Sequence, residues 1–146
     1  MSLFSIYFKL GVGHITDLQA YDHILFLIVL CAVYHIKQWK KTLILITAFT
    51  LGHSLTLALA ALKLLKINTA YIEFLIPVTI LITSILNLFI RNFVVTPRLH
   101  LYKYILTGFF GLIHGLGFSN YLIQLLGEES NIVLPLFSFN IGIEAG

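Results

Sequence analysis

The sequence is poor in cysteine, proline and charge. It has one cysteine, three prolines and 10% charged residues in a chain of 146. The single cysteine, Cys31, excludes an intramolecular disulfide and a cysteine-rich metal cage within one chain. Hydrophobic residues make up 59% of the chain, and apolar runs of roughly 20 residues recur along it, as in polytopic membrane proteins. No change of composition or soluble linker divides the chain, so we expect one domain over residues 1–146.

The apolar segments are expected to be helices, because backbone groups in lipid must be hydrogen-bonded within the protein. The predicted fold class is therefore all-α, a polytopic transmembrane helix bundle. Charged breaks place about five spans at residues 19–36, 42–62, 70–90, 102–126 and 131–146. Residues 1–18 lack a small-residue cleavage site and are too short to cross, so we expect an interfacial segment. The last span is only about 24 Å long, which predicts that a further helix follows it.

The basic residues predict the orientation. The first connection between spans holds Lys37, Lys40 and Lys41, and the third holds Arg91, Arg98 and Lys103. Basic loops face the cytoplasm, so the N-terminus is expected outside it, in a protein of the bacterial inner membrane. The net charge of +3 is therefore explained by basic residues in the connections between spans, and we expect no nucleic-acid partner.

Five ionisable residues interrupt the apolar spans, namely Asp22, His23, His53, His114 and Glu144. Each costs at least about 2.5–3.5 kcal/mol near the middle of a membrane, so the set needs partners or a function. Counting about 1.5 Å per residue from the span ends places His53, His114 and Glu144 near the midplane. Asp22 and His23, with His14 just before them, are expected at the outer mouth of a path to these residues.

Histidine and carboxylate ligands without thiolate suit divalent nickel, cobalt, zinc, copper or iron, and disfavour magnesium and calcium. A bound cation would also compensate the buried charges of Asp22 and Glu144. Nearby polar side chains are expected to orient the imidazoles by hydrogen bonds; they are Thr50, Ser54, Thr56 and Asn140. The spacing of Gly111 and Gly115 predicts a tight helix contact beside His114.

Other interpretations stay open. His35 and His100 are expected to reach the headgroups, and Glu73 to be an acid at a helix start. The buried histidines could instead serve packing, in a homo-oligomer or a larger membrane complex. Two further rivals are a zinc-dependent hydrolase, with Asp22 or Glu144 as general base, and a haem protein ligated by His53 and His114. We favour transport over an enzymatic role.

Four motifs, in this order, resemble the HupE/UreJ family of membrane proteins. They are residues 13–15 with 21–27, residues 49–57, residues 110–118 and residues 139–144. The resemblance covers nearly the whole chain from Gly13 and implies a multi-helix protein of hydrogenase and urease accessory systems, generally regarded as a nickel or cobalt permease. It implies a metal path formed by His14, Asp22, His23, His53, His114 and Glu144. Two features depart from the family pattern. Ala20 stands where a glycine is expected, and the spacing from His14 to Asp22 is longer than in the best-known members of the family.

Overall fold

The computed structural model describes residues 2–65, 68–89, 96–127 and 131–146. In this part the chain forms six α-helices and one short 3-10 helix, with no strand, which confirms the all-α class. The elements are α1 (Leu3–Thr16), α2 (Tyr21–Cys31), η1 (Ile36–Gln38), α3 (Trp39–Ala61), α4 (Thr69–Leu88), α5 (Pro97–Leu126) and α6 (Val133–Ala145).

Several helix starts carry a side-chain cap. Ser2 accepts a hydrogen bond from the Ser5 amide ahead of α1, and Asn68 accepts one from the Ala70 amide ahead of α4. Thr96 caps α5 through the Leu99 amide, and Pro97 follows it in the first helical position, where its missing amide hydrogen costs nothing. These polar residues therefore fix where each apolar run begins to be helical.

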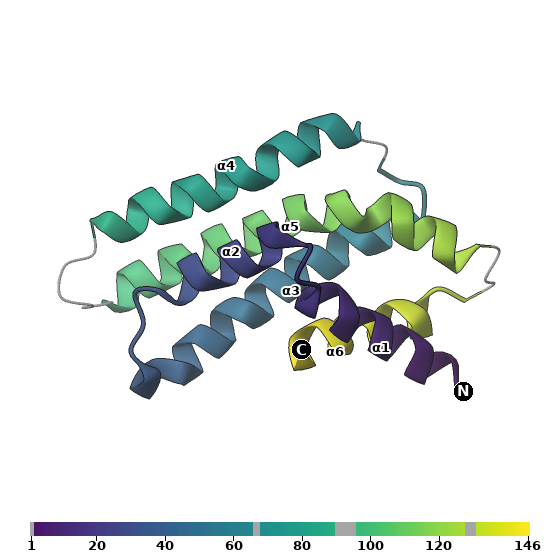
Figure 1. Ribbon diagram of the computed structural model, residues 1–146, viewed down its shortest axis with the longest axis horizontal. Coiled ribbons are helices and arrows are strands. Elements are labelled where there is room, and N and C mark those ends of the chain that lie inside the picture. Colours follow the sequence, from purple (N-terminus) through teal and green to yellow (C-terminus); the bar gives the residue numbers. More distant parts are fainter. Residues whose placement is uncertain (1, 66–67, 90–95, 128–130) are drawn as a thin grey trace.

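Three long helices form the body of the molecule. Helices α3, α4 and α5 run roughly along its long axis (Figure 1). Within the described residues, three segments are long and apolar enough to cross a membrane, namely Ile36–Ala61, Thr69–Leu88 and Pro97–Leu126. They agree with the spans predicted at 42–62, 70–90 and 102–126. Large apolar side chains such as Leu51, Leu81 and Ile105 are exposed on them, as a transmembrane bundle requires.

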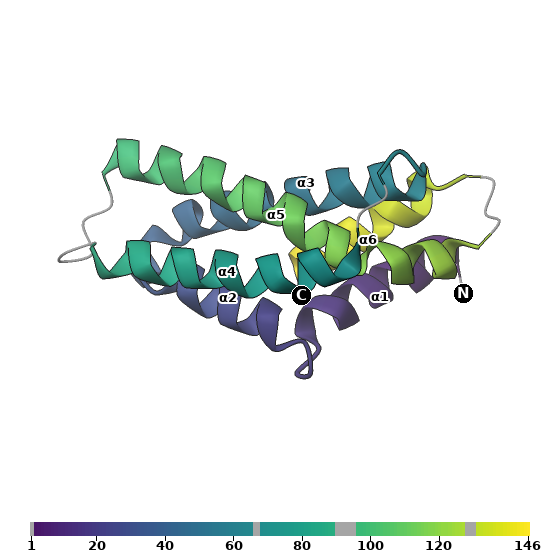
Figure 2. The same ribbon diagram turned by 90° about the horizontal axis from the view of Figure 1, so that it is seen from above.

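The first crossing differs from the expectation. The helix predicted at 19–36 is shorter, Tyr21–Cys31, and the segment expected to be interfacial contains α1. Helices α1 and α2 follow one another end to end, separated by residues 17–20 (Figures 1 and 2). At the break the Asp17 carboxylate accepts a hydrogen bond from the Gln19 amide at 2.9 Å. Such a local bond competes with helix formation, which explains a helix end that hydropathy alone does not indicate.

Helix α1 packs against α6. A Cβ on Gly11 would collide with the carbonyl oxygen of Phe139, and one on Gly142 would collide with that of Phe8, so the two backbones touch. Tyr7 and Phe139 are buried in the same apolar cluster. The short helix α6 is thereby held beside α1, and α6 also contacts α3.

Helices α3 and α5 also approach backbone to backbone. A Cβ on Gly111 would collide with the carbonyl oxygen of Phe49, and one on Gly115 with that of His53. Small residues allow this close approach of membrane helices. The tight contact predicted beside His114 is confirmed.

We predict that Gly111→Ala destabilises the protein by about 1–3 kcal/mol, because the added methyl group has no space against α3. Gly13→Ala is the matched control: nothing lies within 4 Å of its added Cβ, and alanine favours a helix by about 1 kcal/mol over glycine. Thermal unfolding in detergent measures both variants. Equal melting temperatures for the two would contradict the packing described above.

Candidate metal site

Four histidines from four helices meet in the middle of the bundle. His14 lies in the last turn of α1, His23 in the first turn of α2, and His53 and His114 lie within α3 and α5. The rings of His14 and His23 are 4.6 Å apart between centroids, those of His14 and His53 are 5.9 Å apart, and those of His23 and His114 are 6.0 Å apart. The break between α1 and α2 therefore places His14 and His23 side by side.

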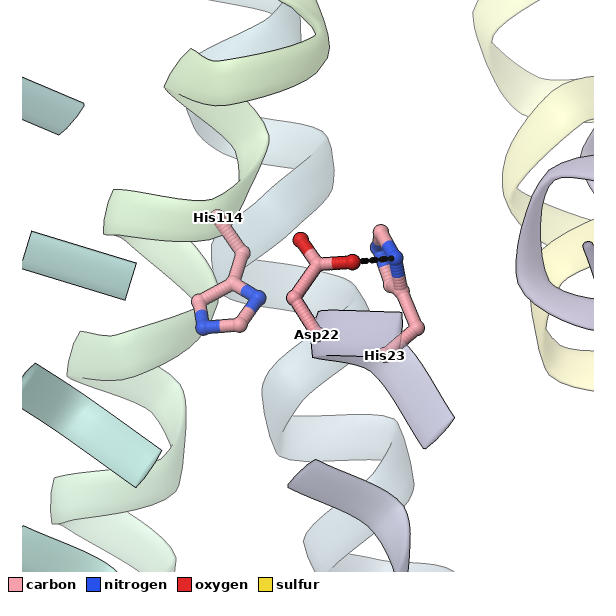
Figure 3. A group of neighbouring side chains, drawn as sticks. All are labelled: Asp22, His23 and His114. Atoms are coloured by element: carbon pink, nitrogen blue, oxygen red, sulfur yellow. Dashed lines mark hydrogen bonds and ion pairs between the residues drawn. The ribbon is translucent and has the colours of Figure 1, made fainter. Parts of the chain in front are cut away.

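Asp22 completes a group of three side chains that could hold a metal ion. Its Oδ1 lies 3.2 Å from Nδ1 of His23. One ligand atom each from Asp22, His23 and His114 can be chosen so that all three lie within 4.8 Å of one another. In Figure 3 the Asp22 carboxylate lies between the two imidazole rings. This spacing allows three ligands to hold one cation.

Most of the imidazole nitrogens have no hydrogen-bond partner. His53 and His114 are 1% and 2% exposed, and His23 is 7% exposed. Among the described residues nothing bonds to His14 Nε2, His23 Nε2, His114 Nδ1 or either nitrogen of His53. An unsatisfied buried polar atom costs about 1–3 kcal/mol, and each such atom in a native protein requires an explanation. A cluster of them points to a ligand.

Thr79 on α4 orients His114. Its hydroxyl oxygen lies 3.2 Å from Nε2 of His114. The other ring nitrogen, Nδ1, is therefore not used by Thr79. In Figure 3 one nitrogen of the His114 ring faces Asp22. The sequence analysis did not single out Thr79. The signal was a pair of threonines, Thr79 and Thr83, that continue the face of α4 on which Ile72 and Ile76 are buried.

The hydroxyl groups that were expected to orient the imidazoles bond elsewhere. Thr50 donates to the Ile46 carbonyl, Ser54 to the Thr50 carbonyl, and Thr56 to carbonyls of its own helix, including that of His53. A helix offers its i−4 carbonyl to serine and threonine at short range, and this local bond replaces the expected one. The Oδ1 of Asn140 has no partner among the described residues.

Phenylalanine rings enclose the site. The ring of Phe118 lies 3.9 Å from that of His14, and those of Phe49 and Phe26 lie 5.1 and 5.2 Å from that of His114, between centroids. Apolar walls lower the local dielectric constant, which strengthens any bond between a cation and these ligands. The C-terminal end of α1 beside His14 favours positive charge, whereas the N-terminal end of α2 favours the negative charge of Asp22.

Two cavities adjoin the cluster. One of about 450 Å³ is lined by His14 and Asp17 together with Leu10, Gly13, Phe118 and Tyr121. The other, of about 340 Å³, lies between α2 and α4 and is lined by Asp22 and Glu73 with Leu25, Ile76, Pro77 and Ile80. Glu73, expected only as an acid at a helix start, thus shares a cavity with Asp22.

The structure places Glu144 apart from the histidines. Glu144 is exposed, and its Oε1 accepts a hydrogen bond from the Thr47 hydroxyl at 2.5 Å. Thr47 precedes His53 by about 9 Å along the axis of α3. The register of α6 against α1, fixed where Gly142 meets Phe8, sets this position. The expectation that Glu144 shares the space of His23, His53 and His114 is not met.

A comparison with known families agrees with the geometry. The profile described as HupE / UreJ protein matches residues 1–146, the whole chain. The chain belongs to the HupE/UreJ family. This family is linked to nickel or cobalt transport or to accessory roles, and the His/Asp group in this HupE/UreJ chain is consistent with a role that involves a metal. No curated protein and no solved structure matches the chain.

We predict that His53→Leu stabilises the metal-free protein by about 1–2 kcal/mol, because an apolar side chain of similar size replaces two unsatisfied nitrogens. His114→Leu should gain less, since it also loses the contact with Thr79. Thermal unfolding in the presence of a chelator measures both. A lower melting temperature for His53→Leu would show that its nitrogens do have partners.

Proposed function

We propose that the protein binds a divalent transition-metal cation inside the membrane and passes it across. The observation that carries this proposal is the convergence of His14, His23, His53 and His114 with Asp22, most of them with unpartnered nitrogens, at one place in the bundle. Nitrogen and carboxylate ligands without thiolate suit nickel, cobalt, zinc, copper or iron. Nickel and cobalt come first because the family is linked to them.

The ligand set supports exchange rather than permanent binding. Structural metal sites close around the ion with four protein ligands, whereas transport requires binding that is weak enough to release. Asp22, His23 and His114 supply three ligands at one place. The ring of His14, next to His23, offers a fourth ligand that the cation would meet before the other three. A cation that enters through the cavity beside His14 and Asp17 would reach His23 and Asp22 next.

The direction of the path follows from the charges at the two ends of the bundle. The end where α3 and α5 begin carries the exposed Lys37, Lys40 and Arg98; we name it the basic end. By the distribution of basic residues we propose that it faces the cytoplasm and that α1 begins outside, in the bacterial inner membrane. The cavity beside His14 would then serve uptake.

Glu144 remains in the proposed path as a later ligand. It bonds to Thr47, which lies closer to the basic end than His53 does along α3. A cation leaving the histidines toward the basic end would therefore meet this carboxylate next. A cavity of about 260 Å³ lined by Glu144 and Thr50, together with Phe26 and Phe49, adjoins it.

A zinc-dependent hydrolase is the second candidate, because three ligands within 4.8 Å of one another also leave a position for a water molecule. Haem is disfavoured, since Phe26, Phe49 and Phe118 pack against the histidine rings where a porphyrin would lie. Nickel uptake into proteoliposomes supports transport, whereas zinc-dependent peptide cleavage without uptake supports the hydrolase.

We predict that His23→Ala and His114→Ala each lower nickel affinity more than about 100-fold. Loss of a residue that only hydrogen-bonds to a metal ligand costs roughly 10–100-fold, and loss of the ligand itself should cost more. His35→Ala is the control, because His35 is an exposed histidine away from the cluster. Elemental analysis and titration calorimetry of the purified variants measure the effect. Wild-type nickel content in both cluster variants would contradict the proposed site.

We predict that Thr79→Val lowers nickel affinity by roughly 10-fold, because His114 loses the group that fixes its ring. Thr83→Val is the matched control, since Thr83 is buried on the same face of α4 and bonds only to the Thr79 carbonyl. Titration calorimetry compares the two. Equal affinities would show that Thr79 does not orient the metal ligand.

A further inference from the structure

Lys103 is a buried lysine that connects three helices. It is 5% exposed on α5, and its Nζ donates a hydrogen bond to Oδ1 of Asn87 on α4. Asn87 in turn donates from Nδ2 to the carbonyl oxygen of Val29 on α2. We call this chain of two bonds the Lys103 link.

The charge of Lys103 is not compensated by an acid. Among the described residues no carboxylate lies within ion-pair distance of its ammonium group. Its other close group is the ring of Tyr34, whose centroid lies 5.7 Å from Nζ. A buried ammonium group costs several kcal/mol after relaxation, so a lysine at this depth requires a function or a strong structural reason.

The Lys103 link lies on the basic side of the metal site. Lys103, Thr107, Phe110 and His114 all belong to the buried face of α5, and Lys103 precedes His114 by about 16 Å along the helix. Between the two lies an apolar cluster formed by Phe26, Leu30, Leu45, Phe49 and Phe110. This cluster and the positive charge of Lys103 behind it lie on the α5 side of the proposed path, beyond the Glu144 carboxylate that bonds to Thr47.

The other direction is more open. The cavity of about 450 Å³ beside His14 and Asp17 adjoins the metal site without an intervening lysine in its lining. The described conformation therefore offers the larger cavity, about 450 Å³, on the side of α1, and on the side of the basic end a cavity of about 260 Å³ with the Lys103 link beyond it. This asymmetry is the state expected of a transporter that awaits its substrate.

We propose that the Lys103 link is a latch that closes the metal path toward the basic end. This inference rests on the proposed metal transport. The link joins α2, which carries Asp22 and His23, to α5, which carries His114. Separation of α2 from α5 would break the link and move the metal ligands apart in one motion, so release and opening are coupled. Lys103 is thus a positioning residue and not a metal ligand.

Two variants break the latch in different ways. Lys103→Met removes the ammonium group at similar length, and Asn87→Leu removes both hydrogen bonds. Each is expected to raise passive nickel flux through proteoliposomes several-fold and to lower nickel affinity no more than several-fold, because opening also moves the ligands apart. Lys103→Arg keeps the positive charge and a hydrogen-bond donor, so its nickel flux should stay as low as that of the wild-type protein.

Matched controls exist for both changes. Lys37→Met removes an exposed lysine at the same end, and Asn120→Leu removes an asparagine that joins α5 to α4 through Thr69 at the opposite end. Both should behave as wild type. The latch is refuted if the link variants show the flux of these controls, or if they lose nickel binding and flux together.

A thiol measurement tests the latch without metal. In a Cys31→Ser background, Thr107→Cys places a thiol on the buried face between Lys103 and His114. A membrane-impermeant maleimide added at the basic end should react slowly with this protein and several-fold faster after Lys103→Met or Asn87→Leu. Equal reaction rates overturn the latch, and the result does not depend on whether the protein transports nickel.

Discussion

The contact between the backbones of α3 and α5 is the constraint on which the site depends. Gly115, the residue after His114, would meet His53 with any side chain larger than hydrogen, so the two helices are in register at the depth of these histidines. This contact fixes the positions of the two histidines on the longest helices. The helices that carry His14, Asp22 and His23 then pack around that pair. Without the close approach, the histidines would face neighbours at different distances and could not form one cluster.

The break between α1 and α2 supplies the rest of the site. Helix ends leave backbone groups unpaired, which is tolerated at membrane depth only inside protein or beside a cavity. Here the break lies next to the cavity lined by His14 and Asp17. The same discontinuity brings His14 and His23 together, although they are nine positions apart in the sequence. Discontinuous helices with ligand sites at their ends are a recurring feature of transporters.

Polar groups in this bundle fall into two kinds. The hydroxyl groups of Thr50, Ser54 and Thr56 satisfy themselves on their own helices and leave the imidazoles free. Asn87 and Lys103 instead satisfy one another across helices, and the Thr79 hydroxyl, which donates to the Ile76 carbonyl of its own helix, also contacts His114 across helices. The first kind has little effect on helix arrangement. The second kind joins specific helices, so breaking one of these bonds would change how those helices pack.

The sequence by itself determined the all-α membrane class, the three long helices and the chemistry of the site, because hydropathy and residue type are local properties. It also indicated which histidines and which aspartate form the candidate site. Only the tertiary structure decided the break after α1, the position of Glu144 beside Thr47, and the hydrogen bonds of Thr79 and Lys103 to other helices. These depend on the register and rotation of one helix against another. Register is set by contacts between residues far apart in the chain, and no local pattern encodes them.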